Sequence, residues 1–334
     1  MVDTEEEQTF HSLLEDCIRV AINLNNDDFQ DDDVLGLCTG NHKETCVPYI
    51  AGLFLGIKIV AFDTSISIQD NVYLLRKITP KVIFVEQNKL TDVEESMHLA
   101  DVSIKLVVIG DDAHDNTLFS DYLDASEEDV SNFEPVSLKS NKETAAILFS
   151  SGTTGLPKGI CLSHYGLLNQ SLLFTFSGLY GSSRQPVSMS FGQLYWISSV
   201  IFLMSTTLSG IARVIKETYE ADKVWKIIEK YKVNLIFLSP FQCLDLNRSS
   251  KPEDVNTSSL YVLGCGGGPL SEKLNSSLRD LLPGTFILQI YGQTEVAGAS
   301  TMFQMRKVDE QLLSYYRPNS VGRPVPGFWF KVRR

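Results

Sequence analysis

The chain opens with apolar residues spaced three and four positions apart. The recurring positions are Phe10, Leu13, Leu14, Cys17, Ile18, Ala21 and Leu24. An α-helix places residues at this spacing on one face. The pattern therefore predicts an opening amphipathic helix that covers part of a core.

Short apolar runs follow, separated by stretches of helix length. They occupy 34–38, 59–62, 81–85 and 106–109. Each is too short for a helix, and runs such as VIFV and KLVVIG are apolar throughout rather than alternating. Such runs are expected for parallel strands that helices bury on both faces. The order of runs and stretches predicts β-α-β-α units in a doubly wound sheet.

An acidic stretch rich in Ser, Asn and Asp interrupts this pattern at 111–142. It predicts a mostly exposed connection with a short helix around 119–123. Beyond it we predict strands at 145–149, 235–238, 261–263 and 286–289 and helices at 221–231 and 271–281. The predicted fold is α/β, with two doubly wound, mostly parallel sheets and flanking helices. Its parts are a first α/β lobe at 1–110, the exposed acidic connection at 111–142, and a second α/β lobe at 143–334 that contains a phosphate loop.

An uncharged segment, 185–212, resembles a membrane span in its hydropathy. Serine and threonine residues interrupt it repeatedly, which favours a buried core helix over a transmembrane helix.

Composition and charge narrow the possible functions. With 334 residues, 43% of them apolar, the chain can fill the cores of one large or two ordinary lobes. Its net charge of −12 disfavours nucleic acid as a partner. The cysteines are dispersed, as in reduced intracellular proteins, and the histidines show no zinc-binding spacing. The N-terminus lacks the pattern of a secretory signal, so we expect an intracellular protein without a membrane span.

The segment FSSGTTGLPKG at 149–159 carries the clearest chemical signal and follows a predicted buried strand. Glycines, hydroxyl groups and one lysine together suit a polyphosphate, because backbone N–H groups, hydroxyls and a positive charge can converge on it. The alternative is an ordinary Ser/Gly surface loop, which rarely combines these features at the end of a strand. The candidate phosphate ligands are Ser150, Ser151, Gly152, Thr153, Thr154, Gly155 and Lys158.

Two common nucleotide loops do not match this segment. A Walker loop counted from Gly152 would need glycine at Pro157 and a hydroxyl residue at Gly159. No G-x-G-x-x-G opens a helix here with an acidic residue about 20 positions later, so the dinucleotide-binding fingerprint is also excluded.

The segment instead resembles the [ST]-S-G-[ST]-T-G-x-P-K-G signature of adenylate-forming enzymes, which include acyl-CoA synthetases, 4-coumarate-CoA ligases and beetle luciferases. GGGPL at 266–270, YGQTE at 291–295 and SVGRPVPG at 320–327 resemble three further motifs of that family, in the family's order. LCTGNHKETCVPYIAGLFLGI resembles its first strand and helix. The likeness covers nearly the whole chain, is strongest to the insect luciferase-like branch, and corresponds to the N-terminal domain only.

The resemblance implies a reaction in which a carboxylate attacks the α-phosphorus of ATP and pyrophosphate leaves. It places Lys158 and the loop on the phosphates, Thr294 on the α-phosphate, and Glu295 on Mg²⁺, with CoA as the co-substrate. Taken alone, Lys158 is a solvated surface lysine, and a Thr-Glu pair is most often a helix start.

For the adenine ring, the resemblance implies stacking on Tyr291 beside Gly267 and Gly268, with Gly292 in the same motif. By itself Tyr291 could equally be a core aromatic residue. The acyl group is expected against 191–204, 237–243 and 296–303, whose apolar and aromatic character favours a hydrophobic carboxylic acid, fatty or aromatic.

The sequence departs from the family at two places. Family members carry a Pro-Phe-His segment, and here Gly192 or Gln193 stands where its histidine is expected. The resemblance ends before the family's C-terminal lid domain with its catalytic lysine, so we expect that domain to be absent. Two hypotheses remain open: an acid–thiol ligase, and a non-catalytic or truncated relative that binds ATP or an acyl group. The resemblance implies a peroxisomal location, with the cytoplasm as the alternative.

Overall fold

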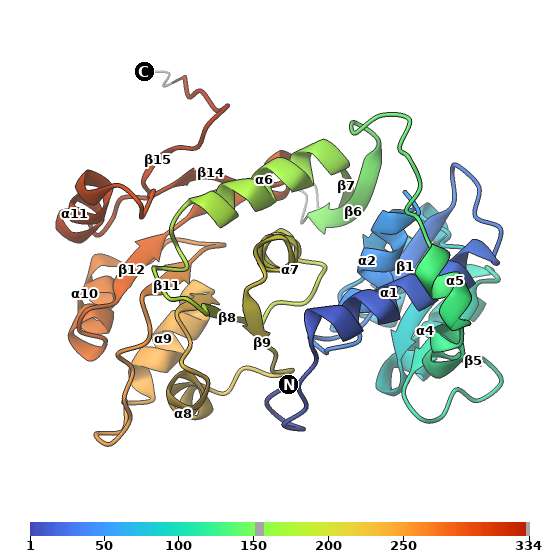
Figure 1. The fold of residues 1–334 in the computed structure, drawn as a ribbon, viewed down its shortest axis with the longest axis horizontal. Helices are drawn as coiled ribbons and strands as arrows, with labels where there is room; N and C mark the ends of the chain where they lie inside the picture. Colours follow the sequence, from blue (N-terminus) through green and yellow to red (C-terminus); the bar gives the residue numbers. More distant parts are fainter. Residues whose placement is uncertain (151–156, 332–334) are drawn as a thin grey trace. The chain divides into compact units, whose positions relative to one another are not determined.

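The computed structural model of the protein describes residues 1–150 and 157–331. Contacts between residues divide the chain into two compact units (Figure 1). The N-terminal unit comprises 7–165 and 193–196, and the C-terminal unit comprises 1–6, 166–192 and 197–334. Each is an α/β unit, as predicted from the sequence.

A seven-stranded sheet in the order β5-β4-β3-β1-β2-β6-β7 forms the centre of the N-terminal unit. Its neighbouring strands run parallel, except that β6 and β7 are antiparallel. The strands are β1 (Val34–Cys38), β2 (Lys58–Ala61), β3 (Val82–Glu86), β4 (Lys105–Ile109), β5 (Thr117–Leu118), β6 (Thr144–Ser150) and β7 (Lys158–Ser163). Its helices are α1 (Phe10–Asn25), α2 (Cys46–Phe54), α3 (Ile68–Lys77), η1 (Gln87–Lys89), α4 (Leu90–Ala100), η2 (Phe119–Leu123) and α5 (Glu127–Asn132).

Side-chain caps explain where several of these helices begin. The hydroxyl oxygens of Thr9, Ser67 and Ser126 each accept the backbone N–H three residues later, at the starts of α1, α3 and α5. Such a cap satisfies an N–H that has no partner within the helix and stabilises it by about 1 kcal/mol.

The division into units differs from the predicted lobes. Strand β6, which we assigned to the second lobe, pairs with β2 through Ile59–Ala146 and Val60–Ile147 and extends the first sheet. The acidic segment 111–142 therefore lies within the N-terminal unit, and its predicted short helix is η2. The buried strand β6 pairs with the edge of β2. Local sequence patterns do not reveal this pairing, because the two strands are distant along the chain.

Two sheets form the C-terminal unit (Figure 1). The first is five-stranded and parallel, in the order β12-β11-β10-β8-β9, and the second is antiparallel, in the order β13-β14-β15. The strands are β8 (Val187–Ser190), β9 (Ala212–Val214), β10 (Leu235–Leu238), β11 (Val262–Cys265), β12 (Phe286–Gln289), β13 (Tyr291–Gln293), β14 (Gly298–Met302) and β15 (Arg323–Pro324). The helices are α6 (His164–Phe176), which enters this unit at Gly166, α7 (Ile197–Ser209), α8 (Ala221–Tyr231), α9 (Pro240–Arg248), α10 (Glu272–Leu281), α11 (Val308–Tyr316) and η3 (Thr294–Val296).

The uncharged segment contains a buried helix, as predicted. Helix α7 buries Val200, Ile201, Phe202 and Leu203, among others, and is shorter than the apolar segment around it. Among the described residues, no helix has both the length and the apolar character needed to cross a membrane.

The first residues of the chain are part of the C-terminal unit. Val2 N–H donates to the carbonyl of Ile215, at 2.9 Å, and the buried Lys216 Nζ lies 2.8 Å from an Asp3 carboxylate oxygen and 3.1 Å from one of Glu220. Burial lowers the pKa of Lys216, but its hydrogen bonds to Asp3 and Glu220 outweigh this effect and raise the pKa above its usual value. The first residues are therefore held to this unit by a backbone hydrogen bond and by an ion pair.

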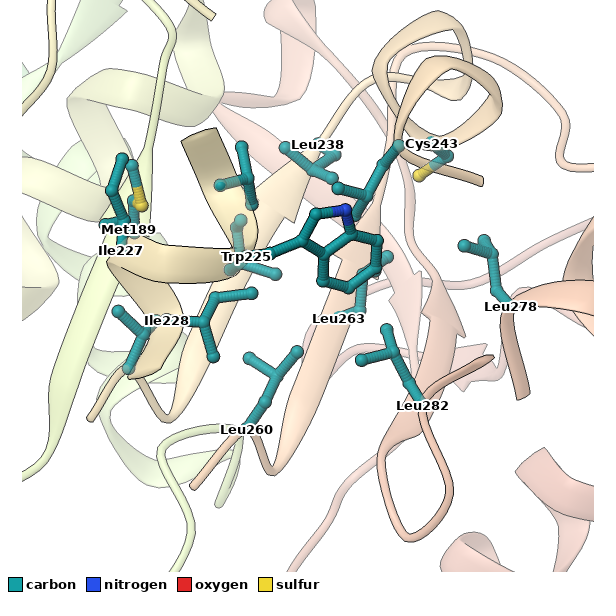
Figure 2. Packing of buried hydrophobic residues seen from close by; sticks show 14 of the residues in the cluster. Met189, Trp225, Ile227, Ile228, Leu238, Cys243, Leu260, Leu263, Leu278 and Leu282 are labelled. Carbon is teal, nitrogen blue, oxygen red and sulfur yellow. The ribbon is translucent and has the colours of Figure 1, made fainter. Parts of the chain in front are cut away.

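The core of the C-terminal unit surrounds Trp225 of α8 (Figure 2). The Trp225 side chain is fully buried among aliphatic residues such as Leu238, Leu263 and Leu282. Its indole N–H donates to Ser249 Oγ at 2.8 Å. The residue thus combines a large apolar surface with a satisfied polar group.

Replacing Trp225 should destabilise this unit. We expect Trp225→Ala to lower the free energy of unfolding by about 3–5 kcal/mol, because it leaves a cavity that the surrounding side chains cannot fill. Trp225→Phe should cost less. Denaturant unfolding of both variants would measure this. Ser249→Ala keeps the indole but removes its hydrogen-bond acceptor, together with the hydrogen bond that Ser249 Oγ donates to the carbonyl of Leu246. A loss below about 1 kcal/mol for Trp225→Ala would contradict the assigned role.

Candidate functional site

In the N-terminal unit, the predicted phosphate loop joins the antiparallel strands β6 and β7. Ser150 pairs with Lys158 across the hairpin, so the backbones of these two candidates face each other where the strands diverge into the loop. Lys158 is exposed and begins β7. The other loop candidates, Ser151, Gly152, Thr153, Thr154 and Gly155, lie outside the described residues.

The base of this hairpin is anchored in the core. Phe149, the residue before Ser150, packs against the core of the N-terminal unit, and its ring lies 6.0 Å from that of Phe62. A packed aromatic residue next to Ser150 fixes the position of the end of β6.

His164 follows the far end of β7. Its backbone N–H donates to the carbonyl of Glu143, at 3.1 Å. Burial lowers the pKa of its imidazole, and the negative charge of Glu143 opposes this only in part. The neutral form of His164 is therefore favoured in the folded chain.

In the C-terminal unit, the second and third motifs leave the sheet side by side. Strands β11 and β12 pair in parallel up to Cys265 and Gln289, and Ile290 N–H then donates to the carbonyl of Cys265 at 2.8 Å. The glycine motif begins directly after β11, and Tyr291 comes directly after Ile290. The carboxyl ends of parallel strands are the usual place for ligands in α/β sheets.

Glycine is required in this loop for two different reasons. A Cβ on Gly266 would lie 2.7 Å from Phe237 Cζ, so the close packing excludes a side chain. Gly267 has a φ of +87°, which favours glycine, and space is open where its Cβ would lie. The backbone at Gly267 is thus accessible to a flat ligand.

Gln289, at the end of β12, links the glycine motif to the segment before the 320–327 motif. Its side chain is buried, its Oε1 accepts Leu270 N–H at 2.9 Å, and its Nε2 donates to the carbonyl of Pro318 at 2.8 Å. Leu270 ends the glycine motif, and Pro318 lies just before the 320–327 motif. Gln289 was not among the predicted site residues. The signal that could have indicated it is a polar side chain at the end of the apolar strand FILQ.

Strands β13 and β14 present Thr294 and Glu295 on the turn that joins them. Gly292 pairs with Ala299, and a Cβ on Gly292 would lie only 2.1 Å from the carbonyl oxygen of Gly298. The two backbones approach this closely because residue 292 has no side chain. The intervening turn η3 leaves Thr294 half-buried and Glu295 exposed.

Tyr291 is not a core residue. Its side chain is 44% exposed, and its hydroxyl accepts a hydrogen bond from Gln293 Nε2 at 2.8 Å. Because Ile290 is hydrogen-bonded to Cys265, Tyr291 begins near the glycine loop. An exposed ring in this position is available for stacking.

Two of the segments expected to contact the acyl group pack together in the C-terminal unit. The rings of Phe202, on α7, and Phe237, on β10, are 5.1 Å apart. Helix α7 also packs against β14, the third expected segment, whose residues are buried. These contacts form an apolar environment near the Tyr291–Glu295 motif.

Gln193, one of the two residues expected at the position of the family's histidine, belongs to the N-terminal unit together with Trp196. Its Nε2 lies 3.0 Å from the hydroxyl oxygen of Thr64, and its Oε1 lies 3.3 Å from the same oxygen. The side chain is therefore held by a neutral polar partner. Sequence analysis did not identify Thr64, because it lies far from Gln193 along the chain.

Comparison with known proteins gives a consistent result. A family model described as AMP-binding enzyme matches residues 1–333. Luciferin 4-monooxygenase of Photuris pensylvanica is 25% identical over 348 residues, an alignment that covers 98% of this chain. The chain spans 60% of the length of that relative.

Two solved structures share the fold. The luciferase-like enzyme of the nonluminescent mealworm Zophobas morio superimposes with a TM-score of 0.89 and 31% identity, covering 96% of this chain and 73% of the other. The anthranilate CoA ligase AuaEII, solved with anthranoyl-AMP, gives a TM-score of 0.78 at 20% identity, covering 97% of this chain and 60% of the other. The second likeness concerns the fold alone.

A side chain at position 292 should disrupt the motif hairpin. We expect Gly292→Ala to speed backbone amide exchange over 291–302 by about tenfold or more, because its Cβ collides with the carbonyl of Gly298. Gly284→Ala is the control for a glycine replacement elsewhere in the unit, because space is open where its Cβ would lie and its φ of +87° confines the strain to its own turn. Exchange measured by mass spectrometry should leave 291–302 unchanged in the control. Equal exchange in both variants would contradict the steric argument.

Acid should destabilise the fold partly through His164. Its pKa in the folded chain is below the ordinary 6.5, so the unfolded state binds the proton more readily. The contribution of His164 to stability is therefore lost as the pH falls below about 6.5. We expect the unfolding free energy of His164→Gln to decline less between pH 7 and pH 5 than that of the unmodified chain. Parallel declines in urea titrations would show that His164 titrates normally.

Proposed function

Because the chain belongs to the AMP-binding enzyme family, we propose that it forms the adenylating part of an acid–thiol ligase. The substrate is a hydrophobic carboxylic acid, fatty or aromatic, which ATP converts to acyl-AMP before the acyl group passes to CoA. The observation that carries this proposal is the placement of the glycine loop and the Tyr291–Glu295 motif side by side, at the carboxyl edge of one parallel sheet.

In the first step, a carboxylate oxygen attacks the α-phosphorus of ATP. The bond from that phosphorus to the bridging oxygen breaks, and pyrophosphate leaves with the electron pair. Negative charge grows on the phosphorus centre and on the leaving group, so the protein must supply positive charge and hydrogen-bond donors at both.

We assign the leaving group to the phosphate loop. Ser150 and Lys158 face each other at the base of that loop, and the exposed Lys158 ammonium can neutralise a phosphate charge. In this proposal the hydroxyl and backbone N–H groups of Ser151, Gly152, Thr153, Thr154 and Gly155 provide the remaining donors.

The adenine ring is assigned to the C-terminal unit. Tyr291 supplies the stacking surface, and the open backbone at Gly267, with the exposed Gly268 beside it, admits a flat ring. Gly292 serves indirectly, because only glycine allows β13 and β14 to approach closely enough to form the motif turn.

Glu295 fits a Mg²⁺ site that is completed by phosphate oxygens. Its carboxylate is exposed, and the described part of the chain contains no cluster of three or more His, Cys, Asp or Glu side chains that could form a complete metal cage. Mg²⁺ commonly binds one or two carboxylates together with substrate phosphates. Bound there, the ion would neutralise phosphate charge, while the neighbouring Thr294 hydroxyl would donate to the α-phosphate.

In the second step, the CoA thiol attacks the acyl carbon, AMP leaves, and the thiol proton is released. The acyl-AMP bound by the anthranilate CoA ligase supports the intermediate, since that ligase shares this fold. The chain spans 60% of the length of its luciferase relative, so we propose the complete two-step reaction for the whole protein. The family resemblance also carries a proposed peroxisomal location, with the cytoplasm as the alternative.

A second candidate is a non-catalytic relative that binds ATP or an acyl group. The observation that favours it is that Gly192 or Gln193 stands where the histidine is expected, and that Gln193 is hydrogen-bonded to Thr64. A neutral amide cannot act as the acid, base or cation that an imidazole can become.

Exchange of radioactive pyrophosphate into ATP tests the adenylation step. With Mg²⁺ and a panel of fatty and aromatic acids, we expect exchange that depends on one class of acid. Lys158→Ala should reduce the rate by about 10²–10³-fold, because a charge that stabilises the leaving group is lost. Lys142→Ala, which removes an exposed lysine before β6, should stay within about threefold. ATP binding without exchange would instead support the non-catalytic relative.

A further inference from the structure

Gln170 is a buried polar residue on α6 that faces the motif hairpin of the C-terminal unit. It is 5% exposed and lies far from the hairpin along the chain. Its Oε1 accepts Ala299 N–H at 3.1 Å, and its Nε2 donates to the carbonyls of Ala299, at 3.0 Å, and Val296, at 3.3 Å. One side chain thus satisfies three backbone groups around a single turn.

The arrangement imitates a strand partner. A glutamine side chain carries the same donor and acceptor as a peptide group, so its amide can pair with both the N–H and the carbonyl of Ala299. Ala299 is also the pairing partner of Gly292 across the hairpin. Gln170 therefore holds the strand residue that faces the Y-G-Q-T-E motif.

The same side chain holds both ends of the turn. Val296 ends η3, directly after Thr294 and Glu295, and Ala299 lies in β14 on the other side of the turn. Ala297 has a φ of +59° between them, a conformation uncommon for a residue with a side chain. Such a conformation persists where surrounding contacts impose it, and the three hydrogen bonds of Gln170 do so.

The close contact of Gly298 with Gln170 supports this reading. A Cβ on Gly298 would lie 3.0 Å from Gln170 Oε1. Because Gly298 has no side chain, the Gln170 amide can reach the backbone groups of Val296 and Ala299 and form hydrogen bonds with them. Burying an amide is costly unless it is fully hydrogen-bonded, so an apolar side chain would fill this space at a lower cost if packing were its sole role.

We propose that Gln170 is a positioning residue for the adenylation step, because it sets the geometry of the turn that presents Thr294 and Glu295. The catalytic consequence of this inference rests on the proposed function. The structural consequence, which is the ordering of 294–299, is independent of it.

The test compares Gln170→Met with Ser171→Ala. Methionine has nearly the same length and a good helix propensity, and it removes all three hydrogen bonds. Ser171 is a buried neighbour on the same helix whose hydroxyl donates to the carbonyl of Leu167 at 2.7 Å, so its variant removes a buried hydrogen bond that does not reach the hairpin. The pair separates a general loss of stability from a loss of positioning.

In pyrophosphate exchange, we expect Gln170→Met to lower kcat by about 10²-fold and to change the KM for the carboxylic acid by less than about threefold, since misplacing a catalytic group affects the transition state most. Ser171→Ala should retain kcat within about threefold. Equal losses of kcat in the two variants, or a loss confined to KM, would overturn the proposal.

Amide exchange over 294–299 tests the structural consequence even if the unmodified chain shows no pyrophosphate exchange. An absence of pyrophosphate exchange would refute the proposed function, and the amide-exchange measurement would then decide the role of Gln170. Gln170→Met should speed exchange there by about tenfold or more, with the amides of β11 and β12 unchanged, whereas Ser171→Ala should not. Unaltered exchange at 294–299 in Gln170→Met would show that the turn orders itself.

Discussion

Strands β11 and β12 end side by side, and the peptide groups that follow them lose the partners that the sheet provided. A buried N–H or carbonyl without a partner costs about 1–3 kcal/mol, so each of these groups needs another partner. Gln289 bonds Leu270 and Pro318, and Gln170 bonds Val296 and Ala299. The glycine loop, the hairpin and the segment before 320–327 thus take their positions from two buried amide side chains. Both amides are polar groups in apolar surroundings, and both form hydrogen bonds with backbone N–H or carbonyl groups.

Close packing against the main chain is the second condition, and it explains why glycine occupies two of these positions. Gly266 lies against Phe237, and Gly292 lies against Gly298, in both places too near for a side chain. The second contact lets the chain pass from the parallel strand β12 to the antiparallel pair β13 and β14 within a few residues. The turn that results projects Glu295 and exposes Tyr291. An adenylating site needs such a display, because the groups that bind the nucleotide must be reachable while the backbone below them stays fixed.

The sequence predicted the elements whose signal is local. Strands β1, β10 and β12 and helix α8 have the predicted bounds, because continuous apolar runs and a helical stripe each depend on neighbouring residues. The pairing of β6 with β2 and the antiparallel strand β7 were missed, since they depend on partners distant along the chain. Motifs identified the candidate residues, but the buried amides that support them had no motif of their own. Gln170 and Ala299 are 129 positions apart, and no spacing rule connects them.

The elements that carry Thr294 and Glu295 are too short to order themselves. Strand β13 and turn η3 each contain three residues, and a short hairpin is marginally stable on its own. Their geometry must come from outside, through the pairing of β13 with β14 and through the hydrogen bonds that Gln170 of α6 makes to Val296 and Ala299. The groups that would meet the nucleotide are therefore exposed or half-buried, whereas the amides that hold them are buried and make no contact with it in this scheme. It follows that the rate of such a reaction can change through Gln170 or Gln289 while every motif residue stays the same, and that a search confined to the motif would not find the cause.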